Sequence, residues 1–462
     1  MISKAEILRR RDFREVLTFT IDPAEAKDFD DALSYEVLPD GLYRVGVHIA
    51  DVTHYVTPGD EEDRQAYDKG TSVYYPDHVD PMLPERLSND LCSLRPNEDK
   101  LCMSVVFTMT GEGEVQRAKV CRTVICSNYR LTYEQAQQRI DTPQDNDPLD
   151  EALQKLHQIA LRLRAQRMRN GALDIEQDEI HFVLDDAGEP TDIYFTTPQP
   201  ANHLIEEFML LANRTVAEQM SRTGKPMVYR VHDKPDEEKL ETLARFKKRM
   251  GDNLPQSTLD MLTVRAMAKA VYSPDNIGHY GLAFDYYTHF TSPIRRYPDM
   301  MVHRLVSRYL LGERHRIGCD DLDEACRHCS AQEQAATMAE RDAVKQMQAR
   351  WIATHIGEEY DGYISGVTDF GLFVTLNESR CDGLIHIRTL YPEHFLDYDE
   401  KNCCLRVYPS KRGKHKRHTP SRDSQAGDKN IVFTLGDRVR VKVVRADVML
   451  RQIDYELVEQ YS

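Results

Sequence analysis

The sequence predicts an α+β protein that ends in a small all-β barrel, and three patterns along the chain support this prediction. Residues from about 15 to 130 carry short runs of β-branched and apolar residues that are typical of strands, such as LYRVGVHI at 42–49. Residues 131–175 and 200–350 carry apolar positions at three- and four-residue spacing, which is typical of helices. From about residue 357, short strand-like runs with turn glycines return and favour a small barrel. Strands and helices in separate stretches indicate the α+β class.

The overall composition is that of a soluble globular protein of several domains. The chain has 462 residues, of which 41% are hydrophobic and 29% charged, and domains commonly span about 100–200 residues. No run approaches the roughly 20 apolar residues that a membrane-spanning helix needs. The start, MISKAEILRRR, has no apolar run of the kind found in secretory signals. We therefore expect a cytoplasmic monomer with no membrane partner.

The formal net charge of −16 argues against a protein coated in positive charge for duplex DNA. It does not exclude a nucleic-acid enzyme, because a local basic channel can steer RNA whatever the net charge.

Ten cysteines are scattered over the chain, unlike the dense disulfide framework of a small secreted domain. Cys326 and Cys329 form a lone CxxC around His328. A zinc knuckle needs a second ligand pair at a defined spacing. The pair is therefore either one half of a zinc site or two ordinary cysteines of a helix.

The most specific pattern is a cluster of four aspartates, Asp22, Asp28, Asp30 and Asp31, within TIDPAEAKDFDDA. Ionised carboxylates this close repel each other unless a cation lies among them. Mg²⁺ or Mn²⁺ suits such a set, because both prefer carboxylate and water ligands. Two such ions can hold the attacking and the leaving oxygen of a phosphodiester. A structural calcium site and a solvated acidic turn are the alternatives.

A second pattern is HFTSPIRRYPDM at 289–300, in which two prolines fix the backbone around Arg295 and Arg296. A guanidinium binds two phosphate oxygens at once and can neutralise charge that develops in a transition state. The alternative is a salt bridge, for example from Arg296 to Asp299.

Two further stretches point to contacts with a nucleic acid. Tyr74 and Tyr75 lie in TSVYYP, and an exposed tyrosine beside a proline turn can stack on bases of any sequence. Glu206 and Glu207 lie in an otherwise apolar helix, where a buried carboxylate needs a partner or a metal ion.

Taken together, these motifs resemble those of the ribonuclease II/ribonuclease R (RNB) family, and they look closer to its ribonuclease R members. The matching stretches, in the family's order over about 300 residues, are IDPAEAKDFDDA, HIADVTHYV, the segment 70–95, IEEFMLLAN and HFTSPIRRYPDMMVHRL. The resemblance implies a 3′→5′ exoribonuclease that degrades single-stranded RNA processively to 5′-nucleoside monophosphates by a two-metal mechanism. It also implies a catalytic domain, at 1–355, with a β-sheet core wrapped by helices.

The resemblance also assigns roles to residues. The four aspartates would be the catalytic and metal-binding carboxylates for Mg²⁺ or Mn²⁺, with Asp30 the most critical. Arg295 would support the transition state; the contact of Arg296 with RNA is a prediction from the paired-arginine motif itself. Tyr74 would clamp the 3′-terminal nucleotide, and Glu206 would lie near it.

Residues 356–462 resemble an S1 domain, an RNA-binding barrel of the OB type. Phe370, Phe373 and His386 occupy positions where such barrels meet RNA, although Phe373 could instead belong to the barrel core. The stretch at about 408–430 is polar and strongly basic, which predicts a disordered insertion that could guide RNA.

Two features depart from the family pattern. Relatives usually carry one or two cold-shock-like barrels before the catalytic domain, but Met1 lies only 21 residues before Asp22. The chain is therefore either a short member or a fragment, and weaker RNA capture is expected. Ile175 replaces a stacking aromatic of the family.

Three questions about function stay open at this point. A catalytically inactive RNA-binding regulator on the same scaffold is one alternative, and a phosphoesterase of small nucleotides is another. Partners in RNA decay or at the ribosome are unknown.

Overall fold

The computed structural model describes residues 2–174, 178–236, 263, 267–313, 319–391, 394–399, 404–409 and 431–461. The chain forms two compact units. The first unit comprises Met1–Glu179, Thr197–Lys234 and Ala268–Ala339; the second comprises Ile180–Thr196, Pro235–Met267 and Glu340–Ser462. The predicted domain division at 355/356 stays a prediction.

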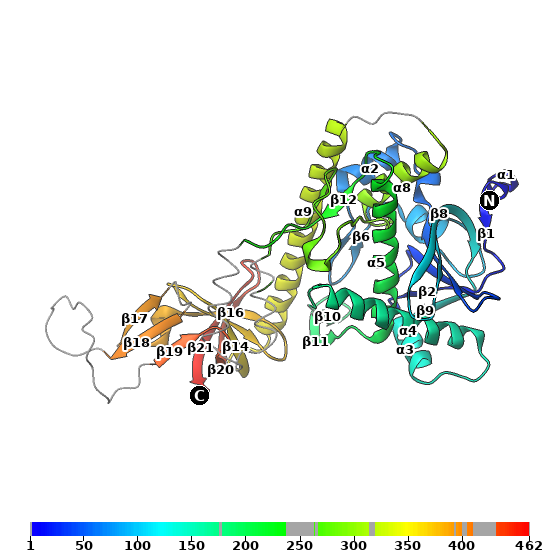
Figure 1. Cartoon of the computed structure of the whole chain (residues 1–462). Coiled ribbons are helices and arrows are strands. Elements are labelled where there is room, and N and C mark those ends of the chain that lie inside the picture. The colour runs from blue at the N-terminus through cyan, green and yellow to red at the C-terminus, as the bar shows by residue number, and fades with distance from the viewer. Residues whose placement is uncertain are drawn as a thin grey trace. The chain divides into compact units, whose positions relative to one another are not determined.

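The first unit is built on one sheet of seven strands (Figure 1). In spatial order these are β1 (Arg11–Asp12), β8 (Val115–Cys126), β7 (Asp99–Met109), β4 (Tyr43–Ala50), β3 (Asp31–Val37), β2 (Thr18–Asp22) and β9 (Tyr129–Thr132). The two outermost pairings, β1 with β8 and β2 with β9, are parallel. The inner pairings are antiparallel.

Helices cover the apolar face of this sheet, and α5 packs against β4 and β7. Fully buried side chains such as Phe19, Leu33, Val45 and Phe107 join the sheet to Phe208 of α5 in one core. The helices of this unit are α1 (Lys4–Leu8), α2 (Glu61–Lys69), α3 (Tyr133–Asp141), α4 (Pro148–Arg169), α5 (Pro200–Ser221) and α8 (Tyr297–Leu310), and α9 (Cys319–Ala353) continues into the second unit.

Local sequence explains where these helices begin. Thr132 and Gln135 cap each other's backbone amides at the start of α3, which is a capping box. Asp147 accepts a hydrogen bond from the Leu149 amide at the start of α4, and Pro148 occupies the first helical position, where its missing N–H costs nothing.

Short elements complete the first unit. They are the hairpin β5 (Val73–Tyr74) and β6 (Val79–Asp80), the pair β12 (Tyr229–Val231) and β13 (Val271–Ser273), the 3₁₀ turns Val52–His54 and Tyr280–Leu282, and the π-helical turn Arg86–Leu91.

The second unit contains a closed barrel of five strands in the order β14 (Glu359–Val367), β15 (Gly371–Leu376), β16 (Asp382–His386), β21 (Gln452–Gln460) and β20 (Arg438–Asp447). Its core includes Ile364, Leu372, Val374 and Val441. Gly371 is required at its position, because a Cβ there would lie 2.2 Å from the carbonyl oxygen of Ile385. The remaining elements are the hairpin β10 (Glu179–Leu184) and β11 (Pro190–Thr196), the sheet of β17 (His394–Asp399), β18 (Cys404–Pro409) and β19 (Ile431–Thr434), and α10 (Ile387–Leu390).

These observations confirm the predicted fold class, a sheet core with helices followed by a small barrel. Cys326 and Cys329 are buried, free cysteines of α9. No helix in the described ranges has the length and apolar character needed to cross a membrane. Ile175 lies outside the described residues, and so does the predicted disordered insertion apart from its first two residues, 408 and 409.

Candidate active site

The four aspartates gather at one end of the sheet because of how β2 and β3 pair. Asp22 is the last residue of β2 and Asp31 is the first of β3, and the two strands are antiparallel neighbours. The loop between them, which carries Asp28 and Asp30, therefore stays at the same sheet edge. Phe29 between those two aspartates is buried in the core, so this apolar side chain anchors the loop.

Burial perturbs all four carboxyl groups, and repulsion from neighbouring aspartates adds to the effect at Asp22 and Asp30. Burial and the charge of Asp31 raise the pKa of Asp22 to about 8. Burial raises the pKa of Asp31 to about 6, although the positive charge of Arg295 opposes the shift. Burial likewise raises the pKa of Asp28 and, more strongly, that of Asp30. Without a bound cation, the protein therefore disfavours the ionised form of these carboxyl groups, most clearly that of Asp22 and Asp30.

The donor set fits a hard divalent cation. The Oδ2 atoms of Asp22 and Asp30 are buried without a hydrogen-bond partner, and such atoms cost free energy unless something binds them. In the described part of the chain, however, no three His, Cys, Asp or Glu side chains converge closely enough to form a metal site. The full ligand set proposed from the sequence stays a prediction.

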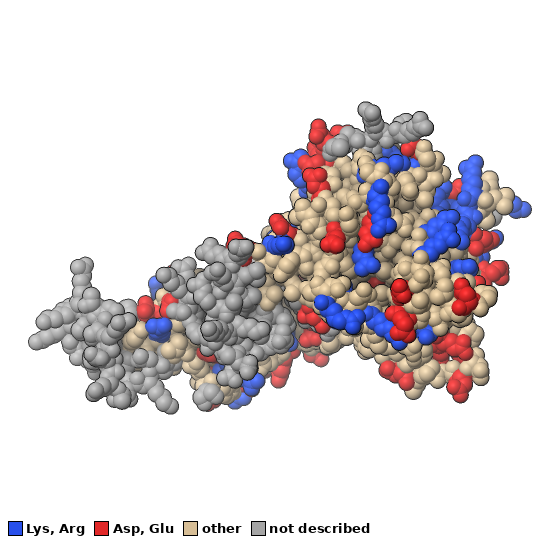
Figure 2. All heavy atoms as spheres, in the orientation of Figure 1, with Lys and Arg blue, Asp and Glu red and all other residues tan. Residues whose placement is uncertain are grey.

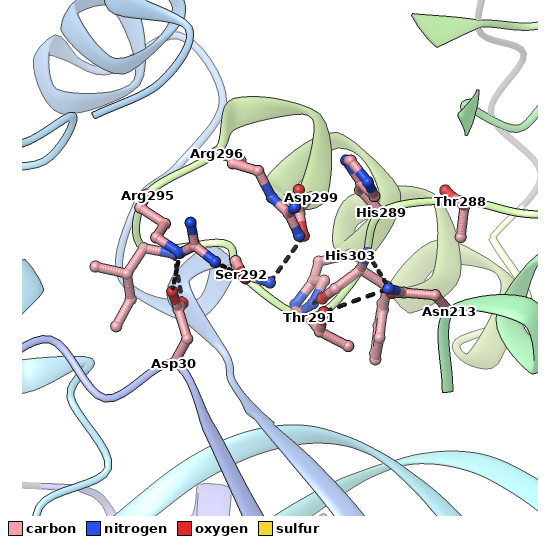
Figure 3. Close-up of polar contacts among 12 residues, drawn as sticks. Asp30, Asn213, Thr288, His289, Thr291, Ser292, Arg295, Arg296, Asp299 and His303 are labelled. Carbon is pink, nitrogen blue, oxygen red and sulfur yellow. Dashed lines mark hydrogen bonds and ion pairs between the residues drawn. The ribbon is translucent and has the colours of Figure 1, made fainter. Parts of the chain in front are cut away.

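The arginine turn lies directly against Asp30, from a segment 264 residues further along the chain (Figure 3). The Ile294 amide donates to Asp30 Oδ1 at 2.8 Å. Arg295 Nε lies 3.6 Å from Asp30 Oδ2, and its Nη2 donates to Ser292 Oγ at 3.2 Å. The Arg295 side chain is still 43% exposed, so its guanidinium can reach an anion beside the aspartates.

Arg296 has a different environment from its neighbour. Its Nη2 donates at 2.8 Å to Oδ1 of Asp299, whose side chain is fully buried. The same Oδ1 accepts the Ser292 amide. The structure thus contains the Arg296–Asp299 salt bridge that the sequence left open, and this bridge holds the turn together. Contact between Arg296 and RNA stays a prediction.

Sequence reasoning missed a second support of this turn, Asn213 of α5. Its Oδ1 accepts the Phe290 amide at 2.9 Å, and its Nδ2 lies 3.4 Å from both Thr291 Oγ1 and Tyr287 Oη. Asn213 is 3% exposed. A buried asparagine that closes the apolar run of IEEFMLLAN was the available signal, because a buried amide needs partners.

The two tyrosines of TSVYYP differ in their surroundings. Tyr74 lies on the β5–β6 hairpin and is 41% exposed. Tyr75 instead stacks on His78, with ring centroids 4.6 Å apart. Tyr74 therefore presents an accessible ring, in keeping with the predicted clamp.

The two glutamates of α5 share one partner, Arg167 of α4. Arg167 Nη2 lies 2.5 Å from Oε1 of Glu207 and 3.2 Å from Oε1 of Glu206. Glu207 is buried, whereas the Glu206 side chain is 44% exposed. Glu206 also lines a pocket of about 330 Å³, together with Arg164, Arg167, Leu173, Asn202 and His203. Glu206 is therefore the glutamate that a ligand can reach.

The predicted RNA-binding residues of the barrel lie on its surface. Phe370 is 44% exposed, and its ring meets the half-buried Phe373 edge-on at 5.8 Å between centroids. Both line a pocket of about 750 Å³ that also involves Lys345 and Arg451. His386 is exposed, and its Nδ1 accepts the Arg388 amide. Phe373 is thus neither wholly core nor wholly exposed.

The chain thus combines a carboxylate-rich end of the sheet, an arginine turn against it and a closed five-stranded barrel, and the family comparisons assign both parts. Residues 10–312 match the RNB domain, and residues 354–457 match the S1 RNA binding domain. The chain therefore belongs to the RNB family, which confirms the resemblance drawn from its motifs. Ribonuclease R members of this family generally require a divalent metal ion.

Individual relatives cover nearly all of this chain. It is 40% identical to ribonuclease R of Aquifex aeolicus (strain VF5) over 99% of its own length, but it spans only 66% of that relative. RNase R of Mycoplasma genitalium, solved in complex with ribose methylated single-stranded RNA, superposes with a TM-score of 0.88 at 27% identity, over 99% of this chain and 73% of that one.

Yeast Ssd1, described as a pseudonuclease, has a TM-score of 0.77 at 18% identity over all of this chain and 69% of its own. This likeness shows the fold alone. Because the same fold occurs in a pseudonuclease, the residues of the site must carry any argument for catalysis.

Proposed function

We propose that the chain is a metal-dependent 3′→5′ exoribonuclease that hydrolyses single-stranded RNA processively to 5′-nucleoside monophosphates. The single observation that carries this proposal is the contact of the arginine turn with Asp30, through the Ile294 amide and the Arg295 side chain. A solvated acidic loop would have no reason to bury a carboxylate against a cation. The relatives named ribonuclease R support the same activity.

Asp22, Asp28, Asp30 and Asp31 would hold one or two divalent ions, with Mg²⁺ the expected ion and Mn²⁺ a substitute. Such ions, when bound, supply a water molecule of lowered pKa and positive charge beside the reacting phosphate. The buried Oδ2 of Asp22, which has no hydrogen-bond partner, and the raised pKa values of the cluster support this assignment.

Arg295 would bind the scissile phosphate. Its guanidinium is anchored at one end by Asp30 and Ser292 and exposed at the other, so a phosphate oxygen can be bound without moving the backbone. A fixed cation at this position stabilises the charge that develops on the phosphate during hydrolysis.

The substrate is proposed to be a strand rather than a free nucleotide. Tyr74 offers one exposed ring for the 3′-terminal base, and Glu206 a reachable carboxylate for the ribose hydroxyls of that nucleotide. Phe370, Phe373 and His386 offer a second group of ring faces on the barrel. Base stacking is worth about 1–3 kcal/mol per base and tolerates any sequence.

Local positive charge accompanies the net negative charge. Lys and Arg side chains gather over β8, where Arg117 and Lys119 are both exposed (Figure 2). Such local groups attract a polyanion even on an acidic protein.

The free cysteines of the described ranges suit a reducing compartment, and we propose that the chain is a cytoplasmic monomer. Its proposed domains are a catalytic domain at 1–355 and an S1 domain at 356–462.

Cleavage of labelled single-stranded RNA by wild type and Asp30→Asn tests this proposal. We expect wild type to degrade the RNA with Mg²⁺ and not with EDTA. Asp30→Asn should bind RNA but leave it whole, and the exposed Asp186→Asn should match wild type. RNA that wild type binds but never cleaves would favour the inactive regulator instead. Faster hydrolysis of dinucleotides than of oligomers would favour the small-nucleotide phosphoesterase.

A further inference from the structure

The tyrosine hairpin and the arginine turn are joined through their backbones, although they lie 224 residues apart in sequence. The Tyr297 amide donates to the Gly70 carbonyl at 2.9 Å, and the Ser72 amide donates to the Arg295 carbonyl at 2.9 Å. Thr71 and Arg296 form an antiparallel bridge between these two bonds. The segment before Tyr74 and the turn around Arg295 thus behave as one short stretch of sheet.

Thr71 adds a side-chain bond to this junction. Its Oγ1 donates to the Arg295 carbonyl at 3.0 Å, which is nearer than the carbonyl of Ser72 at 3.3 Å. A hydroxyl has one proton to donate, and the shorter contact is the stronger candidate. The Arg295 carbonyl therefore accepts two hydrogen bonds, one from each of two consecutive residues.

Ser72 fixes the other side of the junction. The residue is 5% exposed, and its Oγ accepts the Met82 amide at 2.8 Å. Met82 follows β6, the partner strand of the hairpin that carries Tyr74. The hairpin is therefore closed by Ser72 at its base, and the same residue's amide ties it to Arg295.

We propose that Thr71 and Ser72 are positioning residues that set the distance between the clamp for the terminal base, Tyr74, and the phosphate-binding Arg295. Both act through hydrogen bonds within the protein. Thr71 holds the arginine turn, which in turn holds Asp30 through the Ile294 amide. Ser72 holds the tyrosine hairpin. This inference rests on the proposed function, because it assigns the junction a role in placing one phosphodiester against the site.

Substitutions at the two residues should change different kinetic parameters. Thr71→Val removes the hydroxyl at nearly unchanged volume and loosens the arginine turn. We expect its kcat on RNA to fall on the order of 10-fold at an unchanged KM, since small displacements of a reacting group are costly. Thr71→Ser keeps the hydroxyl and should restore kcat. Ser72→Ala leaves the Met82 amide without its acceptor, and we expect KM to rise about fivefold with kcat nearly unchanged.

A matched control and a readout without turnover complete the test. Thr191 donates to the Val183 carbonyl at 3.1 Å on an exposed hairpin, so Thr191→Val makes the same chemical change elsewhere and should leave kcat and KM unchanged. Hydrogen exchange of the amides at 292 and 294–297 should quicken in Thr71→Val and not in Thr71→Ser.

Unchanged kcat and unchanged exchange in Thr71→Val would overturn the inference. A loss of melting temperature in both Thr71 variants, with kcat and KM falling together, would also overturn it and show a merely structural role. If wild type fails to cleave RNA, the proposed function fails, but the exchange measurement still decides whether Thr71 holds the turn.

Discussion

The raised pKa of Asp22 makes the stability of the metal-free protein depend on pH in an unusual direction. Asp22 has a pKa of about 8 in the folded protein, against 3.8 for an ordinary aspartate, because of burial and the charge of Asp31. A carboxyl group with a raised folded pKa stabilises the fold while it is protonated. That contribution is complete below about pH 4 and is lost as the pH rises through 8.

The size of the effect follows from the same two pKa values. Their difference corresponds to at most about 6 kcal/mol, at about 1.4 kcal/mol for each pH unit. For a domain of this size, 1 kcal/mol moves the melting temperature by about 2–4 °C. In EDTA we therefore expect the melting temperature to fall on the order of 10 °C between pH 5 and pH 8.5. Mg²⁺ should remove most of this fall, because it stabilises the ionised carboxylates.

Variants separate this effect from general charge repulsion, which also grows with pH. Asp22→Asn cannot ionise, so its melting temperature should change much less over the same range. Asp186→Asn, which removes an exposed charge, should behave as wild type. Equal losses of melting temperature in wild type and Asp22→Asn would refute the reasoning.

Three further predictions concern single side chains. Arg295→Gln should lower kcat by about 10²–10³-fold. It should also shift the acid limb of the pH–rate profile to higher pH, because the charge of Arg295 opposes the rise in the pKa of Asp28, Asp30 and Asp31 that burial causes. Steady-state kinetics across pH checks this, and an unmoved limb contradicts it. Glu207→Gln should destabilise the fold by about 3 kcal/mol, since it leaves Arg167 buried without its nearest partner. The same change at the more exposed Glu218 should alter the free energy of unfolding by less than about 0.5 kcal/mol. Thermal unfolding of the two variants compares them. Tyr74→Ala should raise KM for RNA on the order of 10-fold through lost stacking, and a similar rise in Tyr75→Ala would argue against Tyr74 as the clamp.

Hydrophobic periodicity was sufficient to predict the kinds of element but not how the strands are arranged. The run 42–49 predicts a strand because it is rich in β-branched and apolar residues, and β4 forms there at Tyr43–Ala50, with its last six residues all buried. The parallel pairing of Arg11 with Thr123, and of Phe19 with Tyr129, joins segments about 110 residues apart. No local pattern encodes such pairings, because they depend on which surfaces remain unpaired once the inner strands have formed.

The aspartate cluster was visible in the sequence because its members lie within ten residues, whereas their partners were not. Arg295 and Arg296 are adjacent and chemically identical, yet one faces Asp30 and the other faces Asp299. Sequence can name the pair but cannot divide their roles. Thr71 was overlooked because its importance comes from the Arg295 carbonyl, a backbone group that no residue type signals.

The central claim is that this chain removes nucleotides from the 3′ end of RNA at the aspartate cluster. The most direct test follows one single-stranded RNA that carries its label at either end, incubated with Mg²⁺. The account predicts that a 3′ label appears at once as a 5′-nucleoside monophosphate, while a 5′ label stays on the strand until the last short product. Early release of the 5′ label, internal cuts, or equal hydrolysis by Asp30→Asn would contradict it.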